Sequence, residues 1–350
     1  MRVSVSNRKV ALGVSGGVDS AVSISVLKNM GYEVIGITCI FDRSEKTDIS
    51  IRDAKSVCES FGILHVVYDA SEDFSRLVLD NFVSSYERGL TPSPCVVCNA
   101  GCKFPSLFNA ADKYDCDFVA TGHYARIGFN DSSKRYCVKE ATDKSKDQSY
   151  MLSMLTQEQL AKIVFPLGSM IKTQVRCIAK DLGLDVADKP ESQDLCFTSS
   201  SYIDYLLESG IKEVPGDIID MSGKVLGKHQ GLFRYTIGQR KGIGIAAAFP
   251  YYVVHKNIET NQLVLGFKES AYTSAVLVKD LNWQAVQAPS TSLECEVKLR
   301  YRSKKSPATL IPYANGEVEI ALHEPELLTS PGQFAVFYED DKILGSGVIC

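Results

Sequence analysis

Short apolar runs rich in β-branched residues alternate with longer segments of helical periodicity between residue 9 and about residue 117. The runs cover residues 10–14, 33–40, 63–68 and 117–120. Each run is apolar throughout, as expected for strands whose two faces are both covered by helices. This pattern predicts an α/β domain built on a parallel sheet. Ligands bind such sheets at the carboxyl ends of the strands, so a site is expected in the loops that follow the runs.

The pattern changes after about residue 127, where FNDSSKRYCVKEA indicates a hairpin with a polar tip. Helical segments are expected around residues 150–155, 157–164 and 171–182. A glycine-rich stretch follows, and from about residue 271 strands recur with turn signals such as Asn315-Gly316. We therefore expect three domains. They are the α/β domain over residues 1–200, a small loop-rich central domain over 201–270 and a C-terminal antiparallel β-barrel over 271–350.

The 350 residues include 11 cysteines, a density too low for a disulfide scaffold. The first residues, MRVSVSNRKV, contain no apolar core of a signal peptide. We expect a reducing, cytoplasmic environment, with Cys58 and Cys177 as small core residues. No stretch approaches the roughly 20 apolar residues of a membrane span. The net charge of −4 argues against general nucleic-acid binding, so any RNA contact must come from local basic patches.

The loop after the first apolar run has the composition of an anion-binding turn. Its adjacent glycines let the backbone turn its amides toward an anion, and the helix expected to begin near Asp19 adds its partial positive charge. A pyrophosphate fits such a loop, whereas the lysine that grips terminal phosphates in phosphoryl transfer is missing. The residues expected to bind a nucleotide here are Gly13, Val14, Ser15, Gly16, Gly17, Val18, Asp19 and Ser20.

The string SGGVDS resembles the signature of the pyrophosphatase-loop ATPases, whose parallel sheet is Rossmann-like and of the adenine nucleotide alpha hydrolase-like type. The resemblance implies that ATP is cleaved between its α and β phosphates and that AMP passes to a carbonyl oxygen. It also implies that Asp19 helps to hold Mg²⁺, that Ser20 contacts the phosphates and that the backbone of Cys39 meets the adenine. Gly122, in ATGHY, is expected near the ATP. The neighbouring His123 is either part of the site or a buried structural histidine.

Two cysteines spaced C-x-x-C, Cys95 and Cys98, stand in the segment TPSPCVVCNAGCKF. Pro92 and Pro94 favour an extended path, so we expect the pair in a loop that leads to a helix beginning near Lys103. A thiol near a helix N-terminus or a lysine is shifted toward the nucleophilic thiolate. The segment therefore suits either sulfur chemistry or metal ligation.

Cys196 lies in ESQDLCF, where no clean helical or strand period is visible, and taken alone it would more often be a packed thiol. Together, SGGVDS, TPSPCVVCN, ATGHY, KDQSY, SQDLCF, FRYTIGQRKGIGI, PYYVV and LRYRS closely resemble the tRNA-specific 2-thiouridylases over nearly the whole chain. The resemblance implies that Cys98 is the nucleophile, that Cys196 carries a persulfide and that the two form a disulfide during turnover. The family's Asn-Pro is Ser93-Pro94 here, and serine cannot make the same pair of hydrogen bonds as asparagine.

The resemblance further implies a reaction and its partners. The reaction is ATP-dependent 2-thiolation of the wobble uridine of tRNA, with AMP transferred to the uracil oxygen at carbon 2 before sulfur replaces it. The partners are the anticodon stem-loop of tRNA and an upstream sulfur carrier or cysteine desulfurase, and we expect the chain to be a monomer. The residues that match the family's tRNA contacts are Ser93, Pro94, Cys95, Lys146, Asp147, Gln148, Arg300 and Tyr301.

Other assignments remain open at this point. Cys95, Cys98 and Cys196 could hold an iron–sulfur cluster with one iron left open, and Cys95, Cys98, Cys102 and one more ligand could hold structural zinc. Other pyrophosphatase-loop adenylating enzymes would lack the two distant cysteines and the barrel. Basic residues that either contact phosphates or form solvated faces are Arg234, Arg240, Lys241, Lys298, Arg302, Lys304 and Lys305.

Overall fold

The computed structural model describes residues 8–184, 195–198 and 201–350. The expected domain end at Ser200 and the first three residues of SQDLCF lie outside these ranges. The N-terminal part contains a parallel sheet in the order β3-β2-β1-β4-β7, which confirms the predicted sheet. Its strands are β1 (Lys9–Gly13), β2 (Glu33–Ile40), β3 (His65–Asp69), β4 (Phe118–Thr121) and β7 (Ile163–Val164).

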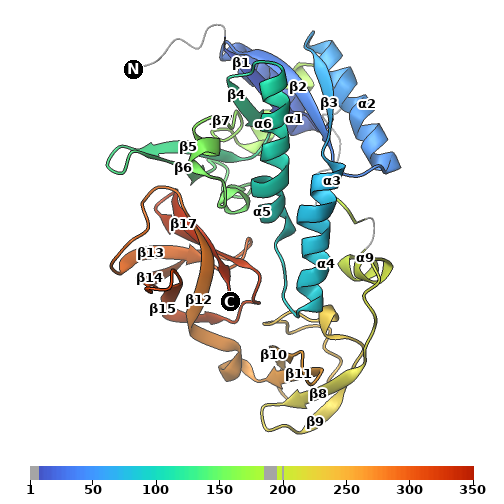
Figure 1. The fold of residues 1–350 in the computed structure, drawn as a ribbon, viewed down its shortest axis with the longest axis vertical. Helices are drawn as coiled ribbons and strands as arrows, with labels where there is room; N and C mark the ends of the chain where they lie inside the picture. Colours follow the sequence, from blue (N-terminus) through green and yellow to red (C-terminus); the bar gives the residue numbers. More distant parts are fainter. Residues whose placement is uncertain (1–7, 185–194, 199–200) are drawn as a thin grey trace.

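Helices cover both faces of this sheet (Figure 1). Val10 and Leu12 of β1 pack with α1 (Val18–Asn29) and α2 (Glu45–Ser60) on one face. The intervening Ala11 packs on the other face in a cluster with Leu107 of α6 (Phe104–Lys113). This double cover explains why the strands are apolar throughout.

Two long helices stand side by side beneath the sheet (Figure 1). In one, α3 (Ser71–Phe74) continues through the π-helical turn η1 (Ser75–Leu79) into α4 (Asp80–Glu87). In the other, α5 (Pro94–Cys98) continues through the π-helical turn η2 (Asn99–Lys103) into α6, and the two π-helical turns are in contact.

The prediction of a loop around Cys95 and Cys98 is wrong, because the helix already begins at Pro94 and both cysteines lie on it. Proline suits the first helical position, where its missing N–H would have no partner in any case. The prediction of one helix over residues 157–164 is also wrong. This segment divides into α7 (Gln157–Leu160) and β7, which pairs with β4 at the edge of the sheet.

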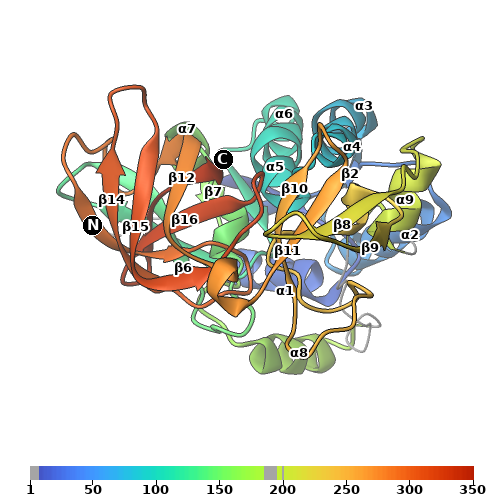
Figure 2. The ribbon, with the colours of Figure 1, turned by 90° about the horizontal axis from the view of Figure 1, so that it is seen from below.

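The C-terminal part is a closed antiparallel barrel, as predicted (Figure 2). Its strands follow the order β12-β15-β14-β13-β16-β17, and β12 pairs with β17 to close it. The predicted hairpin of β5 and β6 is confirmed and adjoins β17 through the pair Lys139 and Lys342. These strands are β5 (Ala125–Asn130), β6 (Arg135–Glu140), β12 (Tyr272–Trp283), β13 (Leu293–Lys298), β14 (Ser306–Pro312), β15 (Val318–Leu327), β16 (Phe334–Glu339) and β17 (Lys342–Ile349).

The central part is small and loop-rich, as predicted. Its strands lie in the order β10-β11-β8-β9 beside the helix α9 (Tyr202–Glu208). They are β8 (Gly216–Asp220), β9 (Val225–His229), β10 (Tyr252–Asn257) and β11 (Gln262–Gly266), with the short 3-10 turns η5 (Leu232–Arg234) and η6 (Lys268–Ala271).

The remaining helical segments differ in length from their predictions. The helix expected over 171–182 is α8 (Lys172–Asp181), whereas the one expected over 150–155 is the short 3-10 turn η3 (Ser149–Leu152). Cys58 is buried as predicted, but Cys177 on α8 is exposed, because it lies on the side of α8 opposite the buried Val175 and Ala179. None of the described helices combines the length and apolar character that crossing a lipid bilayer requires.

The buried side chain of Gln284 connects the first domain to the barrel. Its Nε2 donates to the carbonyl oxygens of Leu152 at 3.1 Å and Ser153 at 3.0 Å. Its Oε1 accepts from the backbone N–H of Val138 at 2.9 Å. Gln284 therefore pairs backbone groups that no water could reach.

We expect Gln284→Leu to lower the free energy of unfolding by about 2–4 kcal/mol, because it leaves these buried backbone groups without partners. Urea denaturation followed by the fluorescence of Trp283, the one tryptophan of the chain, measures the effect. Gln287→Leu is the matched control, since Gln287 lies three positions later and is exposed. Equal denaturation midpoints for the two variants would contradict this role of Gln284.

Candidate active site

The phosphate loop turns sharply between β1 and α1. Gly16 has a φ of +70°, and a Cβ added there would stand 2.6 Å from the Cβ of Asp53. Ser20 Oγ donates to the carbonyl of Gly17 at 2.9 Å and accepts from the N–H of Ser15 at 3.3 Å. Helix α1 begins at Val18, one residue before the predicted start. The loop therefore leads directly into a helix N-terminus, as an anion site requires.

A lysine that the sequence analysis missed reaches the loop from α8. Lys172 Nζ lies 2.8 and 2.7 Å from the two carboxylate oxygens of Asp19, and Tyr124 Oη donates to Asp19 at 2.8 Å. The side chain of Lys172 is only 9% exposed, so its charge acts in a partly desolvated setting. No local sequence signal marks Lys172, because it is brought to Asp19 by the packing of α8 on α1.

The segment after β4 also lies against the phosphate loop. A Cβ added at Gly122 would stand 3.2 Å from the Cβ of Asp19, so the close approach requires glycine. His123 has partners within the protein: its Nδ1 lies 2.7 Å from Thr121 Oγ1 and its ring stacks on Phe104. Burial, and then the charge of Lys103, lowers the pKa of His123 to about 3.

Five cysteines gather where the carboxyl end of β2 meets the helix that begins at Pro94. The ionisation of each is influenced by at least one other member, and Lys103 acts on several of them. The group joins three segments that are distant in sequence. Its members are Cys39, Cys95, Cys98, Cys102 and Cys196.

Cys98 is the member of this group that ionises first. Its pKa is lowered to about 7, first of all by Cys102. Burial would raise this pKa, and the charge and backbone N–H of Lys103 add to the lowering. Burial raises the pKa of Cys39 to about 12 and that of Cys95 above its ordinary value. At neutral pH the group therefore holds a thiolate at Cys98 among neutral thiols.

Cys196 is exposed, yet its thiol stays protonated. The surrounding protein removes part of its hydration, and this burial, followed by the charge of Cys98, raises its pKa to about 11. The next residue, Phe197, packs edge-to-face on Phe82 and Phe74 with ring centroids 5.2 and 6.1 Å apart. Because Phe197 joins the apolar cluster that contains Cys98, this packing brings Cys196 toward Cys98.

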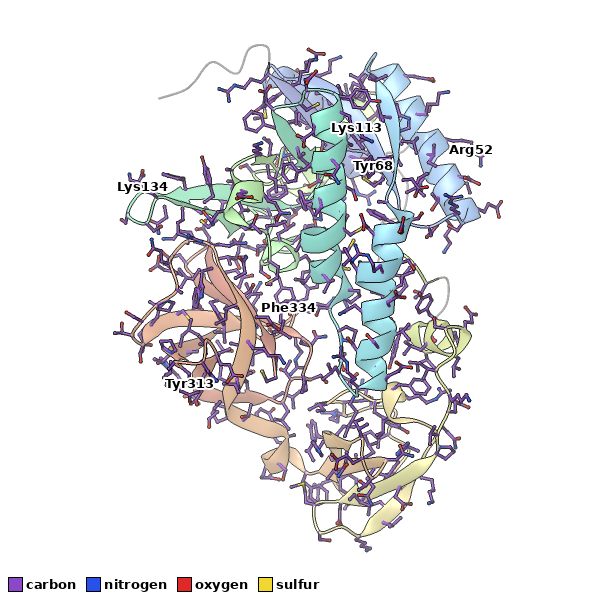
Figure 3. The ribbon with its side chains drawn as sticks, viewed as in Figure 1. Arg52, Tyr68, Lys113, Lys134, Tyr313 and Phe334 are labelled. Atoms are coloured by element: carbon purple, nitrogen blue, oxygen red, sulfur yellow. The ribbon has the colours of Figure 1, made fainter. Side chains whose placement is uncertain are left out.

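Tyr150 organises the predicted RNA contacts at the junction of the first domain and the barrel. Its buried Oη donates to the carbonyl of Phe334 at 2.9 Å. Figure 3 labels Phe334, which lies between the long helices and the barrel. The same hydroxyl meets the side chain of Ser93, and the ring lies 5.9 Å from that of Tyr301. The predicted contacts assembled around this junction are Ser93, Pro94, Cys95, Lys146, Asp147, Arg300 and Tyr301.

Asp147 and Gln148 already have partners within the protein. The buried Asp147 accepts from the backbone N–H of Ala141 at 2.8 Å. Gln148 Oε1 accepts from the backbone N–H of Tyr124 at 2.9 Å. Both side chains thus shape the KDQSY turn.

Several of the basic residues considered for phosphate contacts are paired. Lys298 and Lys305 lie 3.6 and 3.4 Å from the buried carboxylate of Glu140, and Arg234 donates to Glu213 at 3.0 Å. Lys298 and Lys305 therefore serve the junction of the first domain and the barrel. The exposed members of the set are Arg240, Lys241, Arg302 and Lys304.

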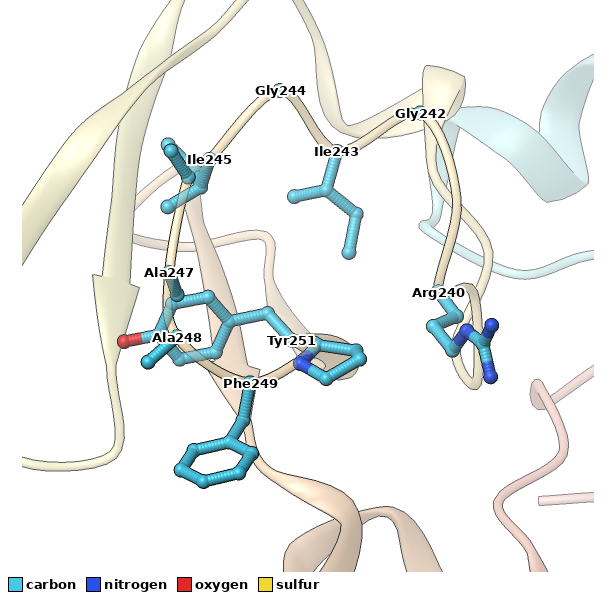
Figure 4. A pocket seen from close by; sticks show the side chains of 11 residues that line it. Arg240, Gly242, Ile243, Gly244, Ile245, Ala247, Ala248, Phe249 and Tyr251 are labelled. Atoms are coloured by element: carbon cyan, nitrogen blue, oxygen red, sulfur yellow. The ribbon is translucent and has the colours of Figure 1, made fainter.

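Arg240 opens a loop in the central part that curls around a hollow of about 530 Å³ (Figure 4). Ile243 points into the hollow and Phe249 points away from it. Phe249 is 72% exposed. The loop thus presents cationic and aromatic groups on one small surface, a combination that suits single-stranded RNA.

The described residues include no group of three or more His, Cys, Asp or Glu side chains arranged to hold a metal ion. The zinc set of Cys95, Cys98 and Cys102 is therefore not found among these residues, whereas the iron–sulfur cluster on Cys95, Cys98 and Cys196 stays a prediction. Mg²⁺ is different, because it is usually held by one or two carboxylates together with substrate phosphates. Asp19 is the carboxylate at the phosphate loop, where both of its oxygens contact Lys172.

Three families match the chain in order. They are the tRNA methyl transferase HUP domain at residues 8–200, the tRNA methyl transferase PRC-barrel domain at 204–267 and the aminomethyltransferase beta-barrel domain at 273–349. The tRNA-specific 2-thiouridylases MnmA of Nostoc punctiforme and Rippkaea orientalis are 43% and 45% identical, over 98% and 97% of this chain and 99% of each relative. The solved U34-tRNA thiolase NcsA from Methanococcus maripaludis with its 4Fe-4S cluster is 20% identical over 60% of this chain and 66% of its own, with a TM-score of 0.35.

We expect Gly16→Ala to weaken ATP binding at least about tenfold, because the added Cβ collides with α2 and displaces the loop. Isothermal titration calorimetry measures the affinity. Gly62→Ala is the matched control: its φ of +63° imposes a similar backbone strain, but nothing lies within 4 Å of the added Cβ. Equal ATP affinities for the two variants would show that strain, not the collision, governs the loop.

Proposed function

The chain belongs to the tRNA-specific 2-thiouridylase family, and we propose that it uses ATP to replace the oxygen at carbon 2 of the wobble uridine of tRNA with sulfur. The observation that carries this proposal is the convergence of Cys98 and Cys196 in one group of thiols. In this proposal residues 1–200 carry the chemistry, and residues 201–270 and 271–350 help to hold the tRNA.

Adenylation comes first, because a uracil oxygen is a poor leaving group at neutral pH. The backbone amides of the phosphate loop hold the pyrophosphate as AMP passes to the oxygen at carbon 2. Lys172 gives this loop the positive charge that its own sequence lacks, and it orients Asp19. Mg²⁺, when bound by Asp19 and the phosphates, supplies further charge neutralisation.

Sulfur transfer follows. The terminal sulfur of a persulfide on Cys196 attacks carbon 2, and the bond between carbon 2 and the AMP-bearing oxygen breaks. The Cys98 thiolate then attacks the Cys196 sulfur and breaks the persulfide bond, which leaves the transferred sulfur on the base. If Cys98 attacks first, hydrosulfide is released and becomes the nucleophile at carbon 2.

Both orders end with a Cys98–Cys196 disulfide. A dithiol reductant must supply two electrons to reopen it, and a sulfur carrier or cysteine desulfurase must then reload Cys196. The low pKa of Cys98 supports its assignment as the attacking thiol, because only the thiolate is nucleophilic. Cys196, with its raised pKa, suits the acceptor of sulfur from a donor protein, since it is also exposed.

The tRNA must present a flipped uridine to these thiols. We propose that Tyr301 and Arg300, near Cys95, line the entrance for the anticodon loop, with Lys146 beside them. Arg240, Lys241 and Phe249 in the central part would contact the strand further along.

We expect Cys196→Ser to abolish 2-thiouridine formation while ATP binding stays unchanged, since serine cannot carry a persulfide. The assay incubates tRNA with ATP, Mg²⁺ and a sulfur donor and analyses its nucleosides by mass spectrometry. Cys177→Ser, which alters an exposed cysteine on α8, is the control. Full thiolation by Cys196→Ser would exclude the persulfide route.

The same assay tests the iron–sulfur alternative when the protein is purified anaerobically and its iron is measured. We expect iron-free protein to thiolate tRNA, because Cys98 and Cys196 suffice for the persulfide route. Thiolation that appears only with iron bound would instead make Cys95, Cys98 and Cys196 ligands.

We expect Asp19→Ala to lose pyrophosphate release by at least about a hundredfold, even when sulfide replaces the donor protein, because adenylation precedes sulfur transfer. Release of radiolabelled pyrophosphate from ATP measures this step. Asp181→Ala, at the exposed end of α8, is the control. If Asp19→Ala kept the rate of that control, the phosphate loop would not be the adenylation site.

A further inference from the structure

A four-residue turn carries Cys196. The N–H of Thr198 donates to the carbonyl of Leu195 at 3.2 Å, and the hydroxyl of Thr198 donates to the same carbonyl at 3.4 Å. Cys196 and Phe197 are the two central residues of this turn. Cys196 is exposed, whereas Phe197 is partly buried, so the turn presents a thiol to solvent and a ring to the protein.

The ring of Phe197 packs on rings from three helices. Its centroid lies 6.1 Å from that of Phe74 on α3, 5.2 Å from that of Phe82 on α4 and 5.0 Å from that of Tyr205 on α9. All three pairs are edge-to-face, at separations where aromatic rings attract one another beyond the burial of area. Phe197 is therefore held in one orientation and not only by apolar contact.

Phe197 also connects two apolar clusters. The first contains Cys98 together with Phe74. The second joins α4 to α9 and to Phe233 of the central part. Among the residues that the structure describes, Phe197 alone packs against both clusters. The side chain next to Cys196 therefore lies between the cluster of Cys98 and the helix that leads into the central part.

Cys196 has two requirements that conflict. It must stay exposed so that a sulfur donor can reload it, and it must meet Cys98 in each turnover. The charge of Cys98 already acts on Cys196, since after burial it is the largest cause of the raised pKa of that thiol. An anchor on the neighbouring residue meets both requirements, because it orders the turn without covering the thiol.

We propose that Phe197 is a positioning residue for sulfur transfer, whose ring, seated among three other aromatic rings, holds Cys196 within reach of Cys98. The proposal rests on the function proposed above, because that function makes the two cysteines partners. Phe197 forms and breaks no bond itself: the sulfur, the electrons and the leaving group move between Cys98, Cys196 and the substrate.

The experiment measures how readily Cys98 and Cys196 form a disulfide in the full-length protein. The protein is equilibrated anaerobically with mixtures of reduced and oxidised glutathione, quenched with acid and alkylated, and the Cys98–Cys196 linkage is quantified by peptide mass spectrometry. Oxidised glutathione takes two electrons from the two thiols and yields two molecules of reduced glutathione. The equilibrium constant of this exchange has the unit of concentration, and it is the effective concentration of one thiol at the other.

Phe197→Ala removes the ring and should lower this effective concentration at least about tenfold, since one edge-to-face pair alone can contribute about that factor. Phe197→Leu keeps much of the apolar volume but not the ring geometry, and it should give an intermediate value. Phe41→Leu is the matched control: among the described ring contacts Phe41 meets Phe74, at 5.1 Å, and not Phe197. This control should keep the effective concentration of the unaltered protein.

Tyr205→Leu tests whether the surrounding rings act through Phe197. The change removes the partner of Phe197 that lies on α9. It should lower the effective concentration about threefold in the unaltered protein. Combined with Phe197→Ala it should have no further effect, because the two residues act as one unit. Two reductions that simply add would show that Tyr205 affects the turn by another route and would count against the proposal.

Equal effective concentrations in Phe197→Ala and Phe41→Leu would overturn the proposal. The accompanying turnover measurement should show a lower kcat for thiolation by Phe197→Ala, with an unchanged KM for tRNA. Pyrophosphate release should also stay unchanged, because adenylation precedes the step at Cys196, and this result would show that the variant is folded.

Cys98→Ser tests the proposed function separately. If this variant thiolated tRNA at the full rate, the reaction scheme would fail, and with it the role of Phe197 in sulfur transfer, even if Phe197→Ala had weakened the disulfide. If Cys98→Ser is inactive and Phe197→Ala keeps the effective concentration of the control, only the anchoring role of Phe197 fails.

Discussion

The parts of the candidate site are held at their separations by one rigid element, the helix that runs from Pro94 through η2 to Lys113. Before its first turn, Gln333 of the barrel donates to the carbonyl of Thr91 at 2.8 Å. Further along, Leu107 lies so close to Gly13 that an added Cβ would stand 3.3 Å from it. The same helix therefore touches the barrel at one end and the phosphate loop near the other, with the reactive thiols between them.

The thiols on and around this helix differ in pKa because their surroundings differ. Cys102 and Lys103 lower the pKa of Cys98, whereas burial raises the pKa of Cys39 and that of Cys95. A group of equivalent thiols would have no preferred nucleophile.

The barrel is joined to the first domain by polar groups that are buried at the junction. Gln284 and Tyr150 pair backbone groups across it, and Glu140 gathers Lys298 and Lys305. Such contacts are directional, so they fix the barrel in one orientation more strictly than apolar packing would. The proposed tRNA entrance around Tyr301 depends on that orientation.

The parallel sheet, the β5–β6 hairpin and the barrel were all predictable, because strand patterns and turn signals depend on residues a few positions apart. Where two local rules competed, the prediction was wrong: Pro94 was assigned to an extended path, although proline equally suits a helix start. Likewise the apolar pair at 163–164 continued a helical period but was drawn into the sheet by β4.

The sequence by itself determined the positive-φ turn at Gly16 and the alternation of strands and helices. Only the tertiary structure decided that Lys172 meets Asp19, that Phe197 packs in the same apolar cluster as Cys98 and that Lys298 serves an internal ion pair. The physical reason is the distance along the chain over which each kind of interaction acts. A turn or a strand is set by neighbouring backbone geometry, whereas the partner of a charged or polar side chain is set by the packing of elements that are far apart in the chain.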